Sequence, residues 1–271
     1  MFVSKKSLKF EQNLWGSFKC MVTVIFALFI RETYTLYGES KFGYVWVVFR
    51  DLFSIAFIIA IRYFFRQGMW EGMSMIFYYL LGFILFYIFT ESVSKCVAAA
   101  SANSSILSFP HVTVLDIMIS RCILVVVTNL QAGFILAGIA VALGFTMTVY
   151  DFGMFFYCFT ATCVMGFTMG LFLGSVSQFY PFVGKLWNMS KIFLMIASGV
   201  IVPLDRFHLS TATMEMIYLN PLYQLVEGIR QASSIRYYLV SHVDFGYLNI
   251  IILVTGILGL LLTQSSKYED Q

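Results

Sequence analysis

The sequence predicts an all-α integral membrane protein with six transmembrane helices, an N-terminal amphipathic interface helix and re-entrant helices before the last span. Composition is the first reason: 60% of the 271 residues are apolar and 11% are charged, against roughly 25% charged in soluble domains. Mean hydropathy is +0.84. The second reason is a series of long uncharged runs, each close to the ~20 apolar residues that a membrane-crossing helix needs.

The chain is expected to form one transmembrane domain, residues 1–271. Four spans come from runs without acidic or basic residues, and two further spans are interrupted by charge, at Arg50-Asp51 and at Lys191. The expected spans are residues 44–65, 73–94, 115–145, 154–178, 184–202 and 245–264. An even number of spans places both termini on the same side of the membrane.

The distribution of basic residues predicts that both termini are cytoplasmic, because cytoplasmic segments carry an excess of Lys and Arg. Ten basic residues fall in the segments placed inside, namely Lys5, Lys6, Lys9, Lys19, Arg31, Lys41, Lys95, Lys185, Lys191 and Lys267. Five fall in the segments placed outside, namely Arg62, Arg66, Arg206, Arg230 and Arg236. Arg50 and Arg121 lie within spans.

Two segments do not fit a simple bundle. Residues 21–30 are apolar but too short to cross, and charged residues flank them, so we expect an amphipathic helix over about residues 18–40 at the cytoplasmic interface. Residues 203–240, between the last two spans, contain two helix-like stretches separated by Asn220-Pro221. Their apolar residues predict short helices that dip back into the membrane from the periplasmic side, where protein or water must satisfy their backbone.

A row of glycines runs along the expected fourth span. Gly166, Gly170 and Gly174 are spaced by four residues, and such ridges let two helices approach closely. Packing within one chain and contact with a second subunit both remain open.

Motifs for independent chemistry are missing from the sequence. Gly184-Lys185 lacks both the preceding glycine and the following Ser or Thr of a phosphate-binding loop, because Phe179 and Leu186 occupy those places. The three histidines are far apart and the five cysteines show no metal-ligand spacing. We therefore expect no metal, no cofactor and no nucleotide site in this chain, and a net charge of +3 gives no reason to expect a nucleic-acid partner.

An ordered set of motifs resembles the permease subunits of type-2 ABC polysaccharide exporters, of the capsule-export KpsM-like family. The matching stretches are RETYTLYG at 31–38, FGYVW at 42–46, FPHV at 109–112 with LD at 115–116 and SR at 120–121, SGVIVPL at 198–204 and NPLYQLVEGIR at 220–230. The resemblance covers about residues 25–263. Tyr34 and Leu36 stand where the family usually carries basic residues, and Arg50-Asp51 where it carries Glu-Pro.

The resemblance implies a transport subunit and not an enzyme. Two copies of such a permease pair with two separate ATPase subunits, which bind Mg-ATP, and move a lipid-linked capsular polysaccharide from cytoplasm to periplasm across the bacterial inner membrane. A periplasmic adaptor and an outer-membrane export protein are the further expected partners. Export of O-antigen or a teichoic-type polymer is an alternative, as is an ion-coupled secondary transporter, although the sequence shows no inverted repeat. A membrane enzyme would need a carboxylate constellation, and Glu32 and Asp116 are too scattered to form one.

Three groups of residues are candidates for this function. ATPase contact is expected of the charged end of the interface helix and of a polar cytoplasmic loop, represented by Arg31, Glu32, Asn103 and Pro110. The substrate path is expected along aromatic residues at helical spacing and a charge in the first span, namely Trp46, Phe49, Arg50, Phe53, Tyr79, Phe83 and Tyr87. A periplasmic gate is expected from Pro203, Asp205, Arg206, Asn220, Pro221, Glu227 and Arg230. In this gate, Asn220 caps a helix that starts at Pro221, and Glu227 pairs with Arg230 three residues later.

Overall fold

The structure is a computed structural model that describes residues 5–37, 42–64, 73–99, 112–201, 204, 210–234 and 243–269. Within these ranges every long regular element is an α-helix and there is no β-strand, as the composition predicts. The helices are α1 (Lys5–Tyr37), α2 (Phe42–Phe64), α3 (Met75–Val97), α5 (Val114–Ala142), α6 (Phe152–Phe179), α7 (Phe182–Ala197), α8 (Thr211–Tyr218), α9 (Pro221–Ser233) and α10 (Phe245–Glu269).

Four of the helices in the described part of the chain are long and apolar enough to cross a membrane. They are α3, α5, α6 and the stretch Phe245–Gln264 of α10. Helices α2 and α7 coincide with the expected spans at 44–65 and 184–202, and their membrane crossing stays a prediction. With 16 residues, α7 is about 24 Å long at 1.5 Å per residue, which is shorter than the hydrocarbon core of about 30 Å.

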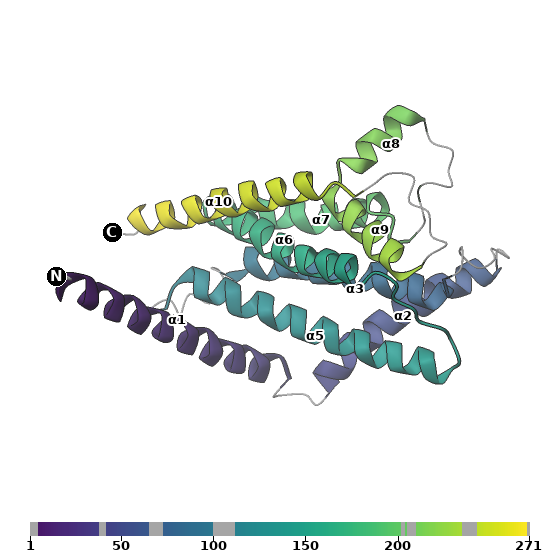
Figure 1. Ribbon diagram of the computed structural model, residues 1–271, viewed down its shortest axis with the longest axis horizontal. Helices are drawn as coiled ribbons and strands as arrows, with labels where there is room; N and C mark the ends of the chain where they lie inside the picture. The colour runs from purple at the N-terminus through teal and green to yellow at the C-terminus, as the bar shows by residue number, and fades with distance from the viewer. Residues whose placement is uncertain are drawn as a thin grey trace.

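The long helices lie side by side around α3 (Figure 1). Helix α3 packs against α5 and α6, and α10 packs on α6. From α3 to α7, successive helices run in opposite directions, so the ends of α3 and α6 lie with the starts of α5 and α7 at one end of the molecule. We call this the inner end, because the basic residues predict that it faces the cytoplasm.

The glycine row on α6 explains the close packing of α6 on α3. A Cβ atom on Gly166 would lie 3.2 Å from the Cα of Phe89, and one on Gly174 would lie 2.9 Å from the carbonyl oxygen of Cys96. Both neighbours belong to α3. The row therefore serves packing within one chain, which decides between the two possibilities that the spacing left open.

Polar residues fix where the central helices begin. Thr113 and Asp116 form a capping box at the start of α5, with the Asp116 amide donating to the Thr113 hydroxyl at 3.3 Å. Asp151 caps α6 by accepting from the amide of Met154 at 2.9 Å. These caps satisfy amide groups that have no partner inside the helix, and they set the register at which α5 and α6 meet α3.

Helix α1 is longer than expected, because it starts at Lys5 and not near residue 18. Its second half runs beside the first turns of α5 and in the same direction (Figure 1). Leu28 is buried in a cluster with Ile117 and Met118 of α5. Phe26 and Tyr34 are exposed on other faces of α1, so the helix presents apolar groups both to the bundle and outward.

The segment between α7 and α10 contains two short helices, as the stretches around Asn220-Pro221 predict. Ser210 caps α8, and Asn220 caps α9 by accepting from the amide of Leu222 at 3.1 Å. Helix α9 packs on α6 and α3 and is buried over almost its whole length. Its re-entrant position relative to a membrane stays a prediction.

Candidate functional site

An aromatic row covers the outward face of α2. Trp46, Phe49, Phe53 and Phe57 follow one another at steps of three or four residues, and their ring centroids are 5.8, 6.2 and 6.1 Å apart. Trp46 is 67% exposed and Phe53 59% exposed. The spacing therefore predicts the row correctly, and it also extends to Phe57, which the sequence did not single out.

The aromatic residues expected on α3 do not join this row. Tyr79 and Phe83 are buried in the core of the chain, where they face other helices. Tyr87 is partly buried and lies next to α2, with its hydroxyl 3.0 Å from the hydroxyl of Ser54. Of the three α3 positions, only Tyr87 comes close to the expected path.

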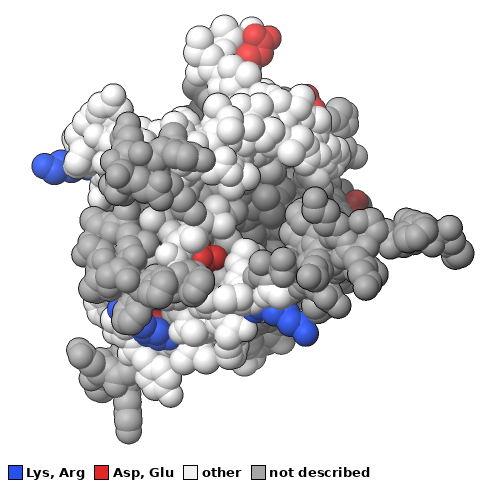
Figure 2. Space-filling model, turned by 90° about the vertical axis from the view of Figure 1, so that its left-hand side faces the viewer, with Lys and Arg blue, Asp and Glu red and all other residues white. Residues whose placement is uncertain are grey.

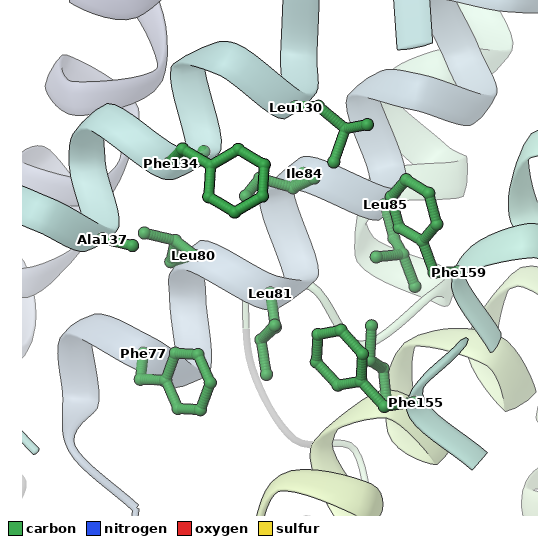
Figure 3. Close-up of a pocket in the computed structure, with 12 residues that line it drawn as sticks. Phe77, Leu80, Leu81, Ile84, Leu85, Leu130, Phe134, Ala137, Phe155 and Phe159 are labelled. Atoms are coloured by element: carbon green, nitrogen blue, oxygen red, sulfur yellow. The ribbon is translucent and has the colours of Figure 1, made fainter. Parts of the chain in front are cut away.

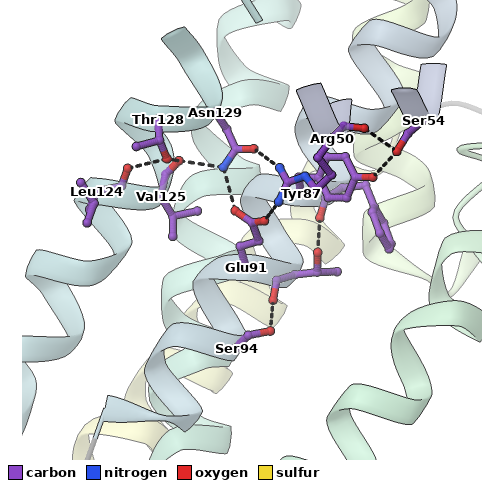
Figure 4. A network of polar contacts seen from close by, with 11 residues as sticks. Arg50, Ser54, Tyr87, Glu91, Ser94, Leu124, Val125, Thr128 and Asn129 are labelled. Carbon is purple, nitrogen blue, oxygen red and sulfur yellow. Dashed lines mark hydrogen bonds and ion pairs between the residues drawn. The ribbon is translucent and has the colours of Figure 1, made fainter. Parts of the chain in front are cut away.

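Arg50 connects α2 to a polar network on α3 and α5 (Figure 4). Its guanidinium pairs with the carboxylate of Glu91 and also donates to the side-chain oxygen of Asn129 at 3.3 Å. The amide of Asn129 donates to the other oxygen of Glu91 at 3.0 Å. The face of the guanidinium covers the ring of Tyr87, 4.1 Å from its centroid.

Tyr87, Glu91 and Ser94 form a polar strip on α3. Steps of four and three residues put them on one face of the helix, and all three are partly exposed. From α7, the indole of Trp187 donates to the Ser94 hydroxyl at 2.9 Å, and Lys191 lies close enough for its charge to interact with that of Glu91. The strip is thus bordered by α2 on one side and by α7 on the other.

A second polar centre joins α9 to the end of α7. Arg230 Nη1 contacts Glu227 Oε1 at 2.6 Å and the carbonyl oxygen of Gly199 at 2.8 Å, while Nη2 donates to the carbonyl oxygen of Val200 at 3.2 Å. The amide of Asn220 donates to the carbonyl oxygen of Ala197 at 3.1 Å. Asn220, Glu227 and Arg230, which we call the α9 clasp, thus hold the last residue of α7, Ala197, and the carbonyl groups that follow it. The last carbonyl groups of a helix have no partner within the helix.

Arg230 and Glu227 of the α9 clasp are completely buried, with side-chain exposures of 0% and 1%, and Asn220 is partly buried. The Arg230 guanidinium lies 3.6 Å above the ring centroid of Tyr78 on α3. Gly82 makes room for it, because a Cβ there would lie 2.5 Å from Nη2. The ion pair predicted from the spacing is confirmed, and residues 198–200 come together with residues 220–230 as parts of one site.

A third ion pair links three helices toward the inner end. Arg121 of α5 donates from Nε and Nη2 to Glu32 of α1, at 3.2 and 3.1 Å, and from Nη1 to the carbonyl oxygen of Lys95 on α3 at 3.2 Å. Glu32 therefore faces the bundle, whereas the neighbouring Arg31 is exposed. The two residues expected to act together at an ATPase contact point in different directions.

The inner end carries scattered charges. Figure 2 looks at this end and shows Lys and Arg side chains in separate places near its edge, with an acidic group exposed closer to the middle. Lys95 in the last turn of α3 and Lys185 in the first turn of α7 belong to this end. Asn103 and Pro110 lie outside the described residues, as do Pro203, Asp205 and Arg206 of the expected gate.

Two cavities beside α5 carry no polar chemistry. One of about 170 Å³ lies between α3, α5 and α6, where Phe77, Ile84, Phe134 and Phe155 are among the lining side chains (Figure 3). The other, of about 180 Å³, lies between α2, α3 and α5 and is lined by aliphatic side chains. Neither offers a hydrogen-bonding side chain to a sugar, so we do not place the path there. Among the described residues, no three His, Cys, Asp or Glu side chains gather as metal ligands.

Sequence comparison identifies the family. The family model described as "ABC-2 type transporter" matches residues 23–233. The chain is 27% identical over 193 residues to the capsule polysaccharide export inner-membrane protein CtrC of Neisseria meningitidis serogroup B, covering 70% of this chain and 71% of that protein.

Further relatives carry related names. The capsule polysaccharide export inner-membrane protein BexB of Haemophilus influenzae is 26% identical over 176 residues, or 65% of this chain and 66% of BexB. The polysialic acid transport protein KpsM of Escherichia coli is 24% identical over 252 residues, or 93% of this chain and 96% of KpsM. The match covers α2, the polar strip on α3 and the α9 clasp, and it confirms the resemblance found in the sequence motifs: this chain is a member of the ABC-2 type transporter family.

Proposed function

We propose that this protein is the permease subunit of an ATP-driven exporter that moves a lipid-linked capsular polysaccharide from the cytoplasm to the periplasm. In this proposal α2 and α7 complete a set of six spans, both termini are cytoplasmic, and two copies of the chain assemble with two ATPase subunits. A periplasmic adaptor and an outer-membrane export protein complete the route. The ATPase subunits bind and hydrolyse Mg-ATP, and this chain forms the path for the polysaccharide.

The observation that carries the proposal is the polar strip on α3. Glu91 is 28% exposed and Arg50 29% exposed, although α3 is one of the helices able to cross a membrane. An ionised side chain is expensive to place in hydrocarbon, by about 2.5–3.5 kcal/mol on insertion scales, and marks a pathway or a protein contact. A strip of such residues between α2 and α7 is therefore suited to a hydrated path that a second copy encloses.

The aromatic row of α2 beside this strip suits a carbohydrate. Sugar rings present C–H groups that pack against the electron-rich faces of aromatic rings, and this packing tolerates variation along a polymer. Arg50 follows directly after Phe49 in the row, so charged and aromatic contacts are adjacent.

The first test is loss and restoration of export. Deletion of the gene should leave lipid-linked polysaccharide inside the cell and remove it from the surface, and a plasmid copy should restore it. The composition of the accumulated glycan identifies it as a capsule, O-antigen or teichoic-type polymer. A deletion strain with unchanged surface polysaccharide and no internal glycan would overturn the proposal.

The second test concerns assembly. The full-length chain, affinity-purified from its own cells, should bring an ATPase subunit with it, and cysteines introduced at Trp46 or Phe49 should crosslink identical chains. Cysteine at Phe156, which is 61% exposed on α6, is the matched control and should not crosslink. A native mass that corresponds to a single copy would rule out a path between two chains.

A further inference from the structure

Arg50, Glu91 and Lys191 form a cluster of charges with an excess of positive charge. They come from three helices, α2, α3 and α7. Glu91 pairs with Arg50. Lys191 lies farther from Glu91 than an ion pair requires, but near enough for the two charges to interact. We refer to these three residues as the Arg50 cluster.

Both carboxylate oxygens of Glu91 are bound by side chains of neighbouring helices. One of its oxygens meets the Arg50 guanidinium and the other accepts from the Asn129 amide at 3.0 Å. Asn129 is itself fixed, because its amide also donates to the carbonyl oxygen of Val125 at 2.9 Å and its own oxygen accepts from Arg50 at 3.3 Å. Asn129 is fully buried whereas Arg50 and Glu91 are partly exposed. Buried Asn129 thus holds the Arg50–Glu91 pair from one side (Figure 4), while both charged side chains remain partly exposed.

With the inner end toward the cytoplasm, as the basic residues predict, the cluster lies at a depth that a lipid of the inner leaflet can reach. Glu91 precedes the end of α3 at Val97 by six residues, or about 9 Å along the helix. The aromatic row of α2 continues from Arg50 toward the opposite end through Phe53 and Phe57. An anionic group at the cluster therefore leaves the attached molecule next to the aromatic rings.

We propose that the Arg50 cluster binds an anionic group of the exported molecule, with Glu91 as an internal competitor for the Arg50 guanidinium. The group is a phosphate of the lipid anchor or a carboxylate of an acidic sugar. Charge-assisted hydrogen bonds to Arg and Lys are stronger than hydrogen bonds between neutral groups. The carboxylate of Glu91 offsets part of this attraction, so the anion binds and is released again. The identity of the carrier rests on the proposed function, but anion binding itself does not.

A purely structural ion pair predicts the opposite response to one substitution. If Arg50 and Glu91 only hold α2 on α3, Glu91→Gln weakens the fold and any binding with it. If Glu91 competes with an external anion, Glu91→Gln removes the competing charge. The Gln oxygen can still accept from Arg50, although its amide nitrogen cannot accept from Asn129. Binding of the anion then becomes stronger. The sign of the change separates the two roles.

The experiment counts lipids that the purified full-length chain retains, by native mass spectrometry, from mixtures of phosphatidic acid and phosphatidylcholine. The wild type should prefer phosphatidic acid, and Glu91→Gln should raise this preference about tenfold, which corresponds to about 1.4 kcal/mol. Lys191→Gln should lower the preference. The double variant Arg50→Gln/Glu91→Gln should lower it too, and this variant removes both charges of the ion pair together.

Lys185→Gln is the matched control, because it removes the same charge from an exposed position on α7 and should change nothing. Displacement of phosphatidic acid by trigalacturonate, but not by a neutral trisaccharide, assigns the site to a sugar carboxylate. Retention despite trigalacturonate assigns it to lipid phosphate. An unchanged or weaker preference in Glu91→Gln, or an equal effect of Lys185→Gln, overturns the proposal. Because no ATPase or export is involved, this result is independent of the tests of transport.

Discussion

At the scale of single residues, the most constrained side chain is Arg230. Its guanidinium pairs with Glu227, donates to two carbonyl oxygens just after α7 and lies over the ring of Tyr78. The Arg230 side chain is not exposed to solvent. Breaking a buried ion pair leaves one charge unpaired and costs about 3–5 kcal/mol. The carbonyl groups of Gly199 and Val200 add to this, because they would lose their donor.

Removal of Arg230 alone should therefore hurt more than removal of the whole pair. We expect Arg230→Met to lower the unfolding temperature of the purified protein and to abolish surface polysaccharide, and we expect Arg230→Met/Glu227→Gln to recover part of the stability. Thermal unfolding followed by size-exclusion chromatography measures this. Equal stability of the single and the double variant would show that a Glu227 carboxylate without its Arg230 partner does not destabilise the fold.

Exchange of the two residues tests how much depends on the carbonyl contacts. Glu227→Arg/Arg230→Glu keeps the charges, but it moves the guanidinium away from the carbonyl groups of Gly199 and Val200. We therefore expect the exchanged protein to export no better than either single variant, as measured by surface polysaccharide. Full rescue would mean that the charge pair suffices and that contact with α7 is not needed.

We expect the neighbouring residues Arg31 and Glu32 to have different roles, Arg31 in ATPase contact and Glu32 in the stability of the fold. Glu32 is bonded to Arg121, so Glu32→Gln should loosen α1 and lower the unfolding temperature. Arg31 is exposed, so Arg31→Ala should leave stability within about 0.5 kcal/mol and reduce copurification of the ATPase. If Arg31→Ala binds the ATPase normally, the contact lies elsewhere on the inner end.

At the scale of helices, α3 organises the molecule, because each polar centre includes it. Tyr78 and Gly82 contact the α9 clasp, Tyr87 and Glu91 contact Arg50, and the carbonyl oxygen of Lys95 accepts from Arg121. Helix α6 supports α3 from the other side through its glycine row. A shift of α3 relative to α6 would disturb all three centres together.

The glycine row gives a direct test of this packing. Gly174→Ala places a Cβ 2.9 Å from the Cys96 carbonyl oxygen, which the backbone cannot avoid, so we expect a loss of about 1–3 kcal/mol. Gly138→Ala on α5 is the control: nothing lies within 4 Å of its Cβ position, and Ala in a helix is more stable than Gly by about 0.5–1 kcal/mol. Unfolding temperatures of both variants should move in opposite directions, and movement in the same direction would contradict the packing argument.

At the scale of the whole molecule, the sequence predicts the elements better than it predicts their contacts. Runs of apolar residues locate the four helices able to cross a membrane, Asn220-Pro221 locates the start of α9, and periodic aromatic residues locate the exposed face of α2. These signals are local. The sequence also shows Glu91 as the single charged residue of the expected span 73–94, and this is the signal that could have identified the polar strip.

The contacts that build the site join residues far apart in the chain. Arg50 and Glu91 are separated by 41 positions and Glu32 and Arg121 by 89, and no spacing rule connects them. The burial of Tyr79 and Phe83 is likewise set by the position of α3 at the centre, and their aromatic character gives no sign of it. The sequence predicts which residues share one face of a helix, but only the packed structure shows which helix that face contacts.

The central claim is that an exported polymer passes along α2 beside the polar strip of α3. The most direct measurement places a photoreactive amino acid at Phe53 and irradiates cells that are exporting polysaccharide. Phe156, on the exposed face of α6, is the control position. The account predicts polysaccharide attached to the chain after irradiation at position 53 and none at position 156. Equal labelling at both positions, or labelling at position 156 alone, would contradict it.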